Sequence, residues 1–333
     1  MSPDTIIVTS IFAPTGPLRK LAAFAEDNRL RLLVIGDTKS PPDFFLSNCD
    51  FWSITRQRDS SLTYAQICPE RSYARKNIGY LLSARSGSEA FIETDDDNAP
   101  KSSGFIRHTI TVSGKTPIAK GWVNAYRFFT DEYIWPRGFP LECLQASMAP
   151  LELQEVESRC PIQQALADGN PDVDAVYRLI LRLPFEFRQT EESLVLGKGQ
   201  WCPFNSQNTI YFREAFPLAY IPATCSFRMC DIWRSFIAQR ILWECDRSVS
   251  FHGATVFQER NDHDLLRDFS DEVPGYLGNN KFIDVLMQLE LKPGLENIPA
   301  NLVKCYDALI AHRFFLCNER QLLDAYLLDL LSS

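Results

Sequence analysis

The sequence predicts an α/β protein with a mixed, mostly parallel central sheet flanked by helices. An apolar, β-branched run at residues 5–10 is followed by helical apolar spacing over residues 16–25 and by a second apolar run at residues 31–36. A helical segment over residues 73–86 then leads to another strand-like run at residues 90–94. Strands that alternate with helices in this way are typical of parallel sheets covered by helices.

The rest of the chain predicts a second half and a helical end. Residues 106–222 mix short strand-like runs with aromatic residues and prolines, which suits a region laid over the first sheet. Helical apolar spacing returns over residues 231–245 and 322–331. We therefore expect one main domain with two halves and a helical C-terminal extension, over residues 1–105, 106–276 and 277–333.

The composition indicates a folded protein that does not bind polyanions through its overall charge. Of the 333 residues, 45% are apolar, enough for a substantial core. The formal net charge of -8 argues against nucleic acid or anionic membranes as partners. No apolar run approaches the roughly 20 residues of a membrane span. The ten cysteines include no CxxC pair, so we expect a cytoplasmic protein.

Three consecutive aspartates, Asp95, Asp96 and Asp97, directly follow the strand-like run at residues 90–94. Carboxylates this close repel one another and raise one another's pKa, whereas a divalent cation would hold them ionised. A solvated acidic loop is the simpler alternative.

Polar residues follow each of the first three predicted strands: Ser10, Asp37 and Asp95. Ligands of parallel sheets bind beyond the carboxyl ends of the strands, so we expect these three segments to converge on one crevice. An acidic protein needs a metal or arginine to hold an anionic ligand there. The sequence therefore predicts a metal-dependent binder of phosphates.

Four separated segments resemble, in order, the STELLO-type glycosyltransferase domain: residues 72–80, 94–98, 168–175 and 258–269. The resemblance extends to about Tyr276, and it is specific because four motifs recur in order. A more distant likeness is to the reversibly glycosylated polypeptides, or UDP-arabinopyranose mutases, through the same aspartates and residues 79–80, 135–140 and 231–233.

Both resemblances imply a GT-A-like nucleotide-diphosphosugar fold. In such a fold residues 1–105 would bind the nucleotide sugar and residues 106–276 would face the acceptor. The families also imply that Mn²⁺ or Mg²⁺ binds at the aspartates, where it would neutralise the donor's diphosphate.

The resemblance implies that Asp95 and Asp97 bind the metal, while Asp96 contacts the donor sugar or the fold. His252 follows a strand-like run and resembles the histidine that GT-A enzymes often use as a further metal ligand. Neutral imidazole suits manganese. His263 competes for this role, and either histidine could instead be a hydrogen-bonded structural residue.

Arg75 and Lys76 open a predicted helix whose first turn would face the crevice, where cations and backbone amides suit phosphate. Asn77 could bond the ribose or the sugar. An ordinary solvated basic turn explains the two cations nearly as well.

Thr9, Ser10 and Asp37 follow the first two predicted strands, where GT-A folds hold the nucleoside. An aspartate can accept a hydrogen bond from the N–H of uracil. Asp37 could equally cap a helix.

Two residues are candidates for catalysis. Asp231 resembles the acidic residue that GT-A enzymes place opposite the anomeric carbon, where an inverting transferase needs a carboxylate to take the acceptor's proton. A helix N-cap is the alternative role. Arg137 aligns with the arginine that becomes glycosylated in the mutases, but a protonated arginine is a poor nucleophile, and an ion pair to the donor is simpler.

A second acidic pair, Asp172 and Asp174, lies in a segment rich in Gly, Asn and Pro. This pair could bind acceptor hydroxyls, although turn formation and helix capping explain it more simply.

We expect a metal-dependent, inverting glycosyltransferase that moves a sugar from a nucleotide donor, preferably a UDP-sugar, to a hydroxyl of a saccharide or other acceptor. One alternative is a UDP-sugar pyranose/furanose mutase, although residues 141–144 depart from that family's pattern. Another is a non-catalytic scaffold for polysaccharide synthesis, because STELLO-type proteins are linked to cellulose synthase. The apolar stripe at residues 322–331 suits either core packing or a homodimer contact.

Overall fold

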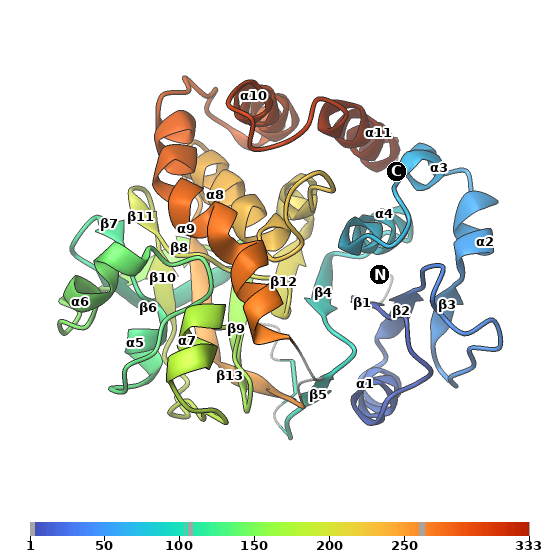
Figure 1. The fold of residues 1–333 in the computed structure, drawn as a ribbon, viewed down its shortest axis with the longest axis horizontal. Coiled ribbons are helices and arrows are strands. Elements are labelled where there is room, and N and C mark those ends of the chain that lie inside the picture. The colour runs from blue at the N-terminus through green and yellow to red at the C-terminus, as the bar shows by residue number, and fades with distance from the viewer. Residues whose placement is uncertain (1–3, 103, 106–108, 260–263, 333) are drawn as a thin grey trace.

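The computed structural model describes residues 4–102, 104–105, 109–259 and 264–332. A large sheet runs through the molecule, and helices cover it on both faces (Figure 1). Among the described residues this sheet has eleven strands: β1 (Thr5–Thr9), β2 (Arg31–Ile35), β3 (Asp50–Trp52), β4 (Ala90–Thr94), β5 (Asn98–Pro100), β6 (Thr111–Pro117), β8 (Leu153–Arg159), β9 (Ile162–Asp168), β10 (Leu194–Leu196), β12 (Asn208–Phe212) and β13 (Val249–Gln258).

The sheet is mixed, as the sequence predicts. Its strand order is β3-β2-β1-β4-β12-β9-β13-β10-β6-β8, and β5 pairs with β13. The first four strands in this order are parallel, whereas β12 is antiparallel to both β4 and β9. β13 is parallel to β9. Two short strands, β7 (Gly121–Trp122) and β11 (Gln200–Trp201), form a separate pair.

The α-helices of the described residues are α1 (Gly16–Asp27), α2 (Ile54–Arg58), α3 (Thr63–Ile67), α4 (Lys76–Arg85), α5 (Tyr126–Phe129), α6 (Leu144–Ser147), α7 (Ala175–Ile180), α8 (Cys230–Trp243), α9 (Leu265–Met287), α10 (Ile298–Ala311) and α11 (Glu319–Leu331). Short 3₁₀ helices are η1 (Tyr73–Arg75), η2 (Leu141–Cys143), η3 (Arg213–Ala219) and η4 (Leu295–Asn297). The predicted α/β fold, with a mixed sheet flanked by helices and a helical C-terminal part, is confirmed.

The first strands are buried on both faces, which explains their continuous apolar runs. Ile7 and Leu33 pack in one cluster with Ile78 of α4. Ile6 and Leu32 belong to a second cluster, which contains the buried side chains of α1. Successive side chains of a strand point to opposite faces, so α1 and α4 cover opposite sides of the parallel half.

Helix α4 lies close to β1 because residue 79 is a glycine. A Cβ atom at Gly79 would lie 2.4 Å from Cγ2 of Ile7, which is too close for any side chain. This close approach fixes the first turn of α4 next to the ends of the strands.

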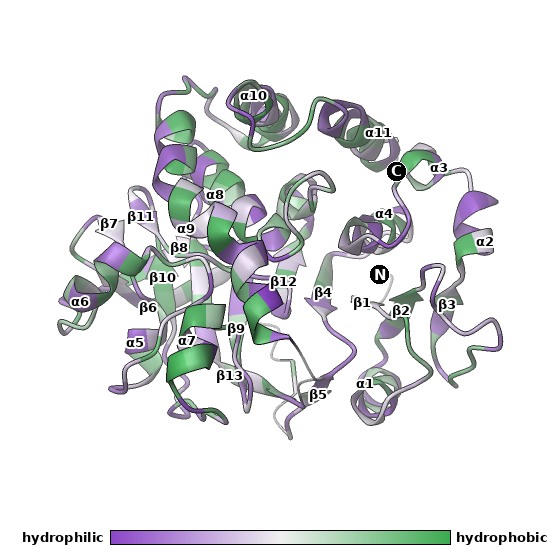
Figure 2. Cartoon of the chain, viewed as in Figure 1, coloured by the Kyte–Doolittle hydropathy of each residue, from purple (hydrophilic) through white to green (hydrophobic). Residues whose placement is uncertain are grey.

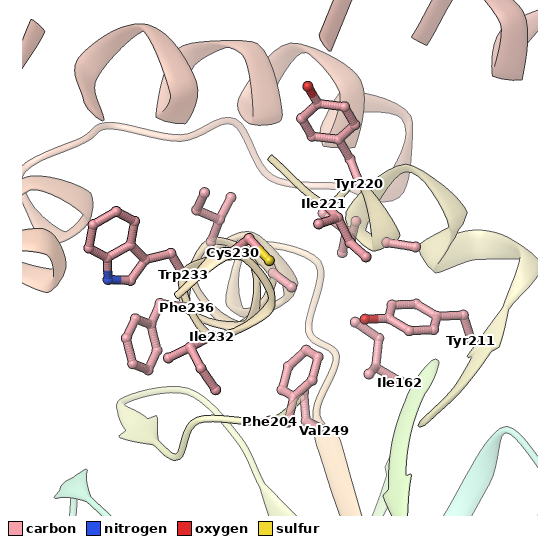
Figure 3. Packing of buried hydrophobic residues seen from close by; sticks show 14 of the residues in the cluster. Ile162, Phe204, Tyr211, Tyr220, Ile221, Cys230, Ile232, Trp233, Phe236 and Val249 are labelled. Carbon is pink, nitrogen blue, oxygen red and sulfur yellow. The ribbon is translucent and has the colours of Figure 1, made fainter. Parts of the chain in front are cut away.

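Helix α8 is the central helix of the second half. All its residues are buried, and Figure 3 shows Ile232, Trp233 and Phe236 pointing from it toward different neighbours. Arg234 of α8 is 1% exposed and pairs with Glu93 of β4 at 2.7 Å. The buried ion pair joins α8 to the parallel half, directly before the aspartates that follow β4.

The C-terminal helices contact both halves. The Asp329 carboxylate accepts hydrogen bonds from the backbone N–H groups of Thr63 (3.0 Å) and Tyr64 (2.8 Å) at the start of α3. Glu319 is fully buried and accepts bonds from four donors of the loop at residues 220–224: the Tyr220 and Thr224 hydroxyls and the N–H groups of residues 223 and 224. The last helix therefore holds both α3 and the loop that leads toward α8.

The expected boundary between residues 276 and 277 falls inside α9. Hydrophobic and hydrophilic residues alternate along this helix (Figure 2), and its buried positions, which recur every three or four residues, form one face toward the protein. Among the described residues, no helix is long and apolar enough to cross a membrane.

Candidate functional site

A cavity of about 380 Å³ opens where the carboxyl ends of β1, β2 and β4 lie side by side. Ser10, Asp37 and Asp95 follow these three strands, and all three line the cavity. The structure thus brings together three segments far apart in the sequence. Nine of the predicted site residues line this cavity: Thr9, Ser10, Asp37, Arg75, Asp95, Asp96, Asp97, Arg137 and Asp231.

Asp95 is held by a buried lysine. Its Oδ1 accepts hydrogen bonds from the Tyr73 hydroxyl (2.7 Å) and from Nζ of Lys76 (3.1 Å). Lys76 is 0% exposed, and its Nζ also donates to the Tyr73 hydroxyl and to the carbonyl of Ser206. An ammonium has three N–H donors, and all three are used. Lys76 therefore positions Asp95 and has no donor left for the phosphate contact that the sequence suggested.

Asp96 is anchored to the loop between β1 and α1. Its Oδ2 accepts a 2.5 Å hydrogen bond from the Ser10 hydroxyl, and its backbone carbonyl accepts one of 2.7 Å from Thr15. Thr15 also caps α1 by accepting from the N–H of Leu18. Burial raises the pKa of Asp96 despite the bond from Ser10.

The charged form of Asp97 is disfavoured. Burial, reinforced by the neighbouring Asp95, raises its pKa to about 7. Nε2 of Gln258 lies 3.1 Å from each of its oxygens and is a neutral donor. A cation bound here would displace the proton that Asp97 otherwise holds at lower pH.

The aspartates fit a cation that binds together with a phosphate ligand. Among the described residues, no group of three or more His, Cys, Asp or Glu side chains is arranged to hold a metal ion by itself. Asp95 and Asp97 can supply two carboxylates, because Oδ2 of Asp95 accepts no hydrogen bond from the described chain. Magnesium commonly binds one or two carboxylates, with water and substrate phosphates completing the shell.

Arg137 is clamped between two carboxylates on the other side of the cavity. Its Nε and Nη2 donate to Asp172 at 2.8 Å each, and its Nη1 and Nη2 donate to Asp231 at 3.0 and 2.9 Å. Nη1 also donates to the carbonyl of Arg228. Burial alone would lower the pKa of Arg137, but the two carboxylates outweigh it and raise that pKa well above its usual value.

Asp231 is ionised and saturated with donors. Burial would raise its pKa, but Arg137 outweighs burial and lowers the pKa to about 2. The N–H and hydroxyl of Ser206 also donate to Oδ2 of Asp231, each at 3.2 Å. A carboxylate held in this way is a weak base until its bonds to Arg137 loosen.

Two hydroxyl groups connect the two sides of the cavity. The Ser206 hydroxyl lies 2.7 Å from the Tyr73 hydroxyl, which donates to Asp95. The same Ser206 hydroxyl is within reach of Asp231. A continuous hydrogen-bond network therefore runs from the aspartate triad to Arg137.

Two of the three residues expected at the start of α4 bond other parts of the protein, although Arg75 also lines the cavity. Arg75 is buried against the cavity wall, where its Nε donates to Gln57 and its Nη1 to the carbonyl of Cys68. Asn77 is fully buried, and both its amide atoms bond the backbone of Ile221, with distances of 2.8 Å. Asn77 is thus a structural tie and is not among the described residues that line the cavity.

His252 lies in β13 and is also not among the described residues lining the cavity. Its Nδ1 lies 3.0 Å from the Ser193 hydroxyl and its Nε2 lies 2.8 Å from the Ser250 hydroxyl. Both ring nitrogens are engaged, so the geometry does not favour His252 as a metal ligand. His263 lies outside the described residues.

Asp37 lies at the end of the cavity near β2. Its carboxylate accepts from the backbone N–H groups of Thr38 (2.6 Å) and Ser72 (3.1 Å). These bonds join the β2 end to the segment before η1. Each oxygen retains capacity for a further donor that faces the cavity.

The two residues of the second acidic pair, Asp172 and Asp174, make different contacts. Asp172 lines the cavity and bonds Arg137. Asp174 caps α7 by accepting from the N–H of Tyr177 and also accepts from Nε1 of Trp135. The capping role that the sequence suggested is therefore found for Asp174, whereas binding of acceptor hydroxyls by Asp172 stays a prediction.

Several residues of the site were not singled out from the sequence. Tyr73 and Gln258 lie within motifs that carry the family resemblance, which was the available signal. Ser206, Phe227 and Arg228 had no such signal, because a serine, an exposed phenylalanine and an arginine in a loop are common in any protein.

The sequence of this chain is similar to those of known proteins. The family described as STELLO glycosyltransferases matches residues 228–333, from Arg228 in the cavity wall through α8 to the C-terminal helices. The chain resembles the STELLO glycosyltransferases. The predicted resemblance is confirmed, and it extends beyond Tyr276 to the end of the chain.

Two STELLO proteins of Arabidopsis thaliana match over most of this chain. It is 28% identical to "Probable glycosyltransferase STELLO2" over 81% of its length and 26% identical to "Probable glycosyltransferase STELLO1" over 72%. These matches span only 38% and 34% of the two relatives. A solved structure titled "Crystal Structure of a Mycobacterial Protein" is 9% identical, with a TM-score of 0.40, and the match covers 86% of this chain and 73% of that one.

Proposed function

We propose that this STELLO-like chain is a metal-dependent glycosyltransferase that transfers a sugar from a nucleotide donor, preferably a UDP-sugar, to a hydroxyl of a saccharide or other acceptor. One observation carries the proposal. A single cavity combines the ends of three parallel strands with the acidic triad, in which the pKa of Asp97 is raised. A separate carboxylate, Asp231 of α8, lines the same cavity.

Asp95 and Asp97 would hold Mn²⁺ or Mg²⁺ with the donor's diphosphate. When bound, the cation would offset the charge of the diphosphate and of the nucleotide that leaves. Lys76 and Tyr73 keep Asp95 in place for this role. Ser10, which bonds Asp96, and Asp37 would contact the nucleoside side of the donor.

Asp231 would accept the proton of the acceptor hydroxyl in an inverting reaction. Its pKa of about 2 makes it a weak base at rest, so the reaction requires its bonds to Arg137 to weaken as substrates bind. We therefore expect the product to have the anomeric configuration opposite to that of the donor, which NMR of the product measures.

The mutase alternative has less support. A covalent role would require Arg137 to lose its proton, yet two carboxylates raise its pKa well above the usual value. An ion pair that orients Asp231 and Asp172 is the simpler role for this arginine.

The proposed function is tested with a panel of nucleotide sugars and Mn²⁺. Mass spectrometry would detect released nucleotide, isomerised donor and sugar attached to the protein. A transferase releases nucleotide, a mutase isomerises the donor, and neither product forms in a scaffold. Asp95→Ala and Asp97→Ala should abolish cation-dependent UDP binding in calorimetry, whereas the exposed Asp131→Ala should not. Unchanged UDP and Mn²⁺ binding in both triad variants would refute the proposal.

A further inference from the structure

An exposed phenylalanine lies inside the charged cavity. Phe227 lines the cavity, and 59% of its surface is exposed. Its ring contacts the ring of Tyr73 edge to face, with centroids 5.6 Å apart. The Tyr73 hydroxyl bonds Asp95, so the Phe227 ring lies next to the aspartate triad. A ring exposed inside a cavity offers an apolar surface that a ligand can cover.

Hydrogen-bonding groups line the same cavity as the ring. Each carboxylate oxygen of Asp172 accepts one hydrogen bond from Arg137 within the described chain, which leaves capacity for further donors. Arg228 binds Glu272 through Nε and Nη2, and its Nη1 donates to no group of the described residues. Both residues line the cavity with Phe227.

Arg137 fixes the relative positions of these groups. Its guanidinium bonds both the Asp172 carboxylate and the backbone carbonyl of Arg228, the residue directly after Phe227. Glu272 holds the Arg228 side chain from the other side, with an ion-pair distance of 2.7 Å. The two polar members of the subsite, Asp172 and Arg228, are therefore held in place by buried ion pairs.

An apolar face beside a hydroxyl-binding carboxylate and a guanidinium matches one class of ligand. A sugar ring has one face of C–H groups and hydroxyls around its edge. The C–H face can cover Phe227 while Asp172 accepts from one hydroxyl and Arg228 donates to another. We propose that Phe227, Asp172 and Arg228 form a subsite for a sugar ring.

This proposal deepens the proposed function, on which its placement beside the donor site rests. The ring could belong to the donor sugar or to a saccharide acceptor, and the chemistry of recognition is the same. Two measurements distinguish these sources. Calorimetry compares UDP with UDP-glucose, UDP-galactose and UDP-xylose in the presence of Mn²⁺. Saturation-transfer NMR detects free methyl glucosides, galactosides and xylosides.

Phe227→Ala should weaken binding of the sugar-containing ligand about tenfold, the size of one aromatic contact, and leave UDP affinity unchanged. Phe227→Tyr keeps the ring and should retain binding. Phe45→Ala is the matched control, because Phe45 is 79% exposed and is not among the residues lining the cavity. If Phe227→Ala loses affinity for UDP-sugars, the donor sugar occupies the subsite. If it loses affinity for free glycosides, the acceptor occupies it.

An equal loss of affinity for UDP and for UDP-sugars would overturn the proposal, because the Phe227 ring would then contact the nucleotide. The absence of any sugar ligand whose binding depends on Phe227 would also overturn it. Failure of the proposed function is distinguishable, since wild-type protein would then release no nucleotide from any sugar donor. A Phe227-dependent glycoside signal in that protein would still support the subsite.

Discussion

Replacing Arg137 by methionine should lower the free energy of unfolding by about 3–5 kcal/mol at pH 7, the usual cost of removing one partner from a buried ion pair. Methionine keeps much of the apolar volume but leaves Asp172 and Asp231 facing each other without a cation. Both carboxylates are buried, with 8% and 4% of their surface exposed.

The structure allows part of this cost to be worked out. The pKa of Asp231 is about 2, against an ordinary value of 3.8. At about 1.4 kcal/mol per unit, its interactions exceed the burial penalty by roughly 2–3 kcal/mol. Losing Arg137 removes this surplus and leaves the burial penalty uncompensated. In the wild-type protein this contribution is present above pH 3.8 and is lost as the pH falls through about 2.

The assay is urea unfolding at pH 7 and pH 4.5. The difference between variant and wild type should shrink at the lower pH, because the unpaired carboxylates of the variant take up protons. Arg320→Met is the control, since the exposed pairs of Arg320 with Asp307 and Asp324 should contribute less than about 1 kcal/mol. A loss below about 1 kcal/mol for Arg137→Met, or a loss independent of pH, would refute the reasoning.

Three further predictions concern stability. Burial raises the pKa of Asp174 to about 7, so the folded protein keeps a proton that the unfolded chain releases near pH 4. The free energy of unfolding should therefore fall as the pH rises from 4 to 7. Asp174→Asn should flatten this fall in urea titrations, and equal slopes in both proteins would contradict the assignment. Glu319→Ala should cost about 2–4 kcal/mol, because it leaves several buried donors unpaired, whereas Asp324→Ala on the exposed face of α11 should cost less than about 1 kcal/mol. Gly79→Ala should cost at least about 1–3 kcal/mol in thermal or urea unfolding, because its Cβ overlaps a side chain of β1. Gly16→Ala, where a Cβ meets nothing within 4 Å, should change stability by less than about 0.5 kcal/mol, and similar losses for both glycines would disprove the packing argument.

The convergence of strand ends could be predicted from the sequence. Ser10, Asp37 and Asp95 follow three apolar runs, and parallel strands present their carboxyl ends at one edge of a sheet. The directions of the side chains around the first turn of α4 could not be predicted in this way. Consecutive residues near a helix start point about 100° apart, so Arg75, Lys76 and Asn77 cannot all face one cavity. Each bonds a different part of the protein.

The sequence also could not predict which charged residues form ion pairs when they lie far apart along the chain. Arg137 bonds Asp172 and Asp231, which are 35 and 94 positions away along the chain. Their residue types suggested separate roles, and only the fold puts them in one ion cluster. His252 illustrates the opposite case, since a residue chosen by family likeness forms hydrogen bonds with Ser193 and Ser250.

The hydrogen bonds that α11 makes with both halves limit how the protein can move. Glu319 holds the loop at residues 220–224, and Asp329 caps α3 in the first half. The pairing of β4 with β12 makes the sheet continuous between the halves. Rotation of one half against the other would break these bonds, so opening and closing by a hinge between domains is disfavoured. A ligand that enters the cavity is therefore expected to move the loops at its rim and not one half against the other.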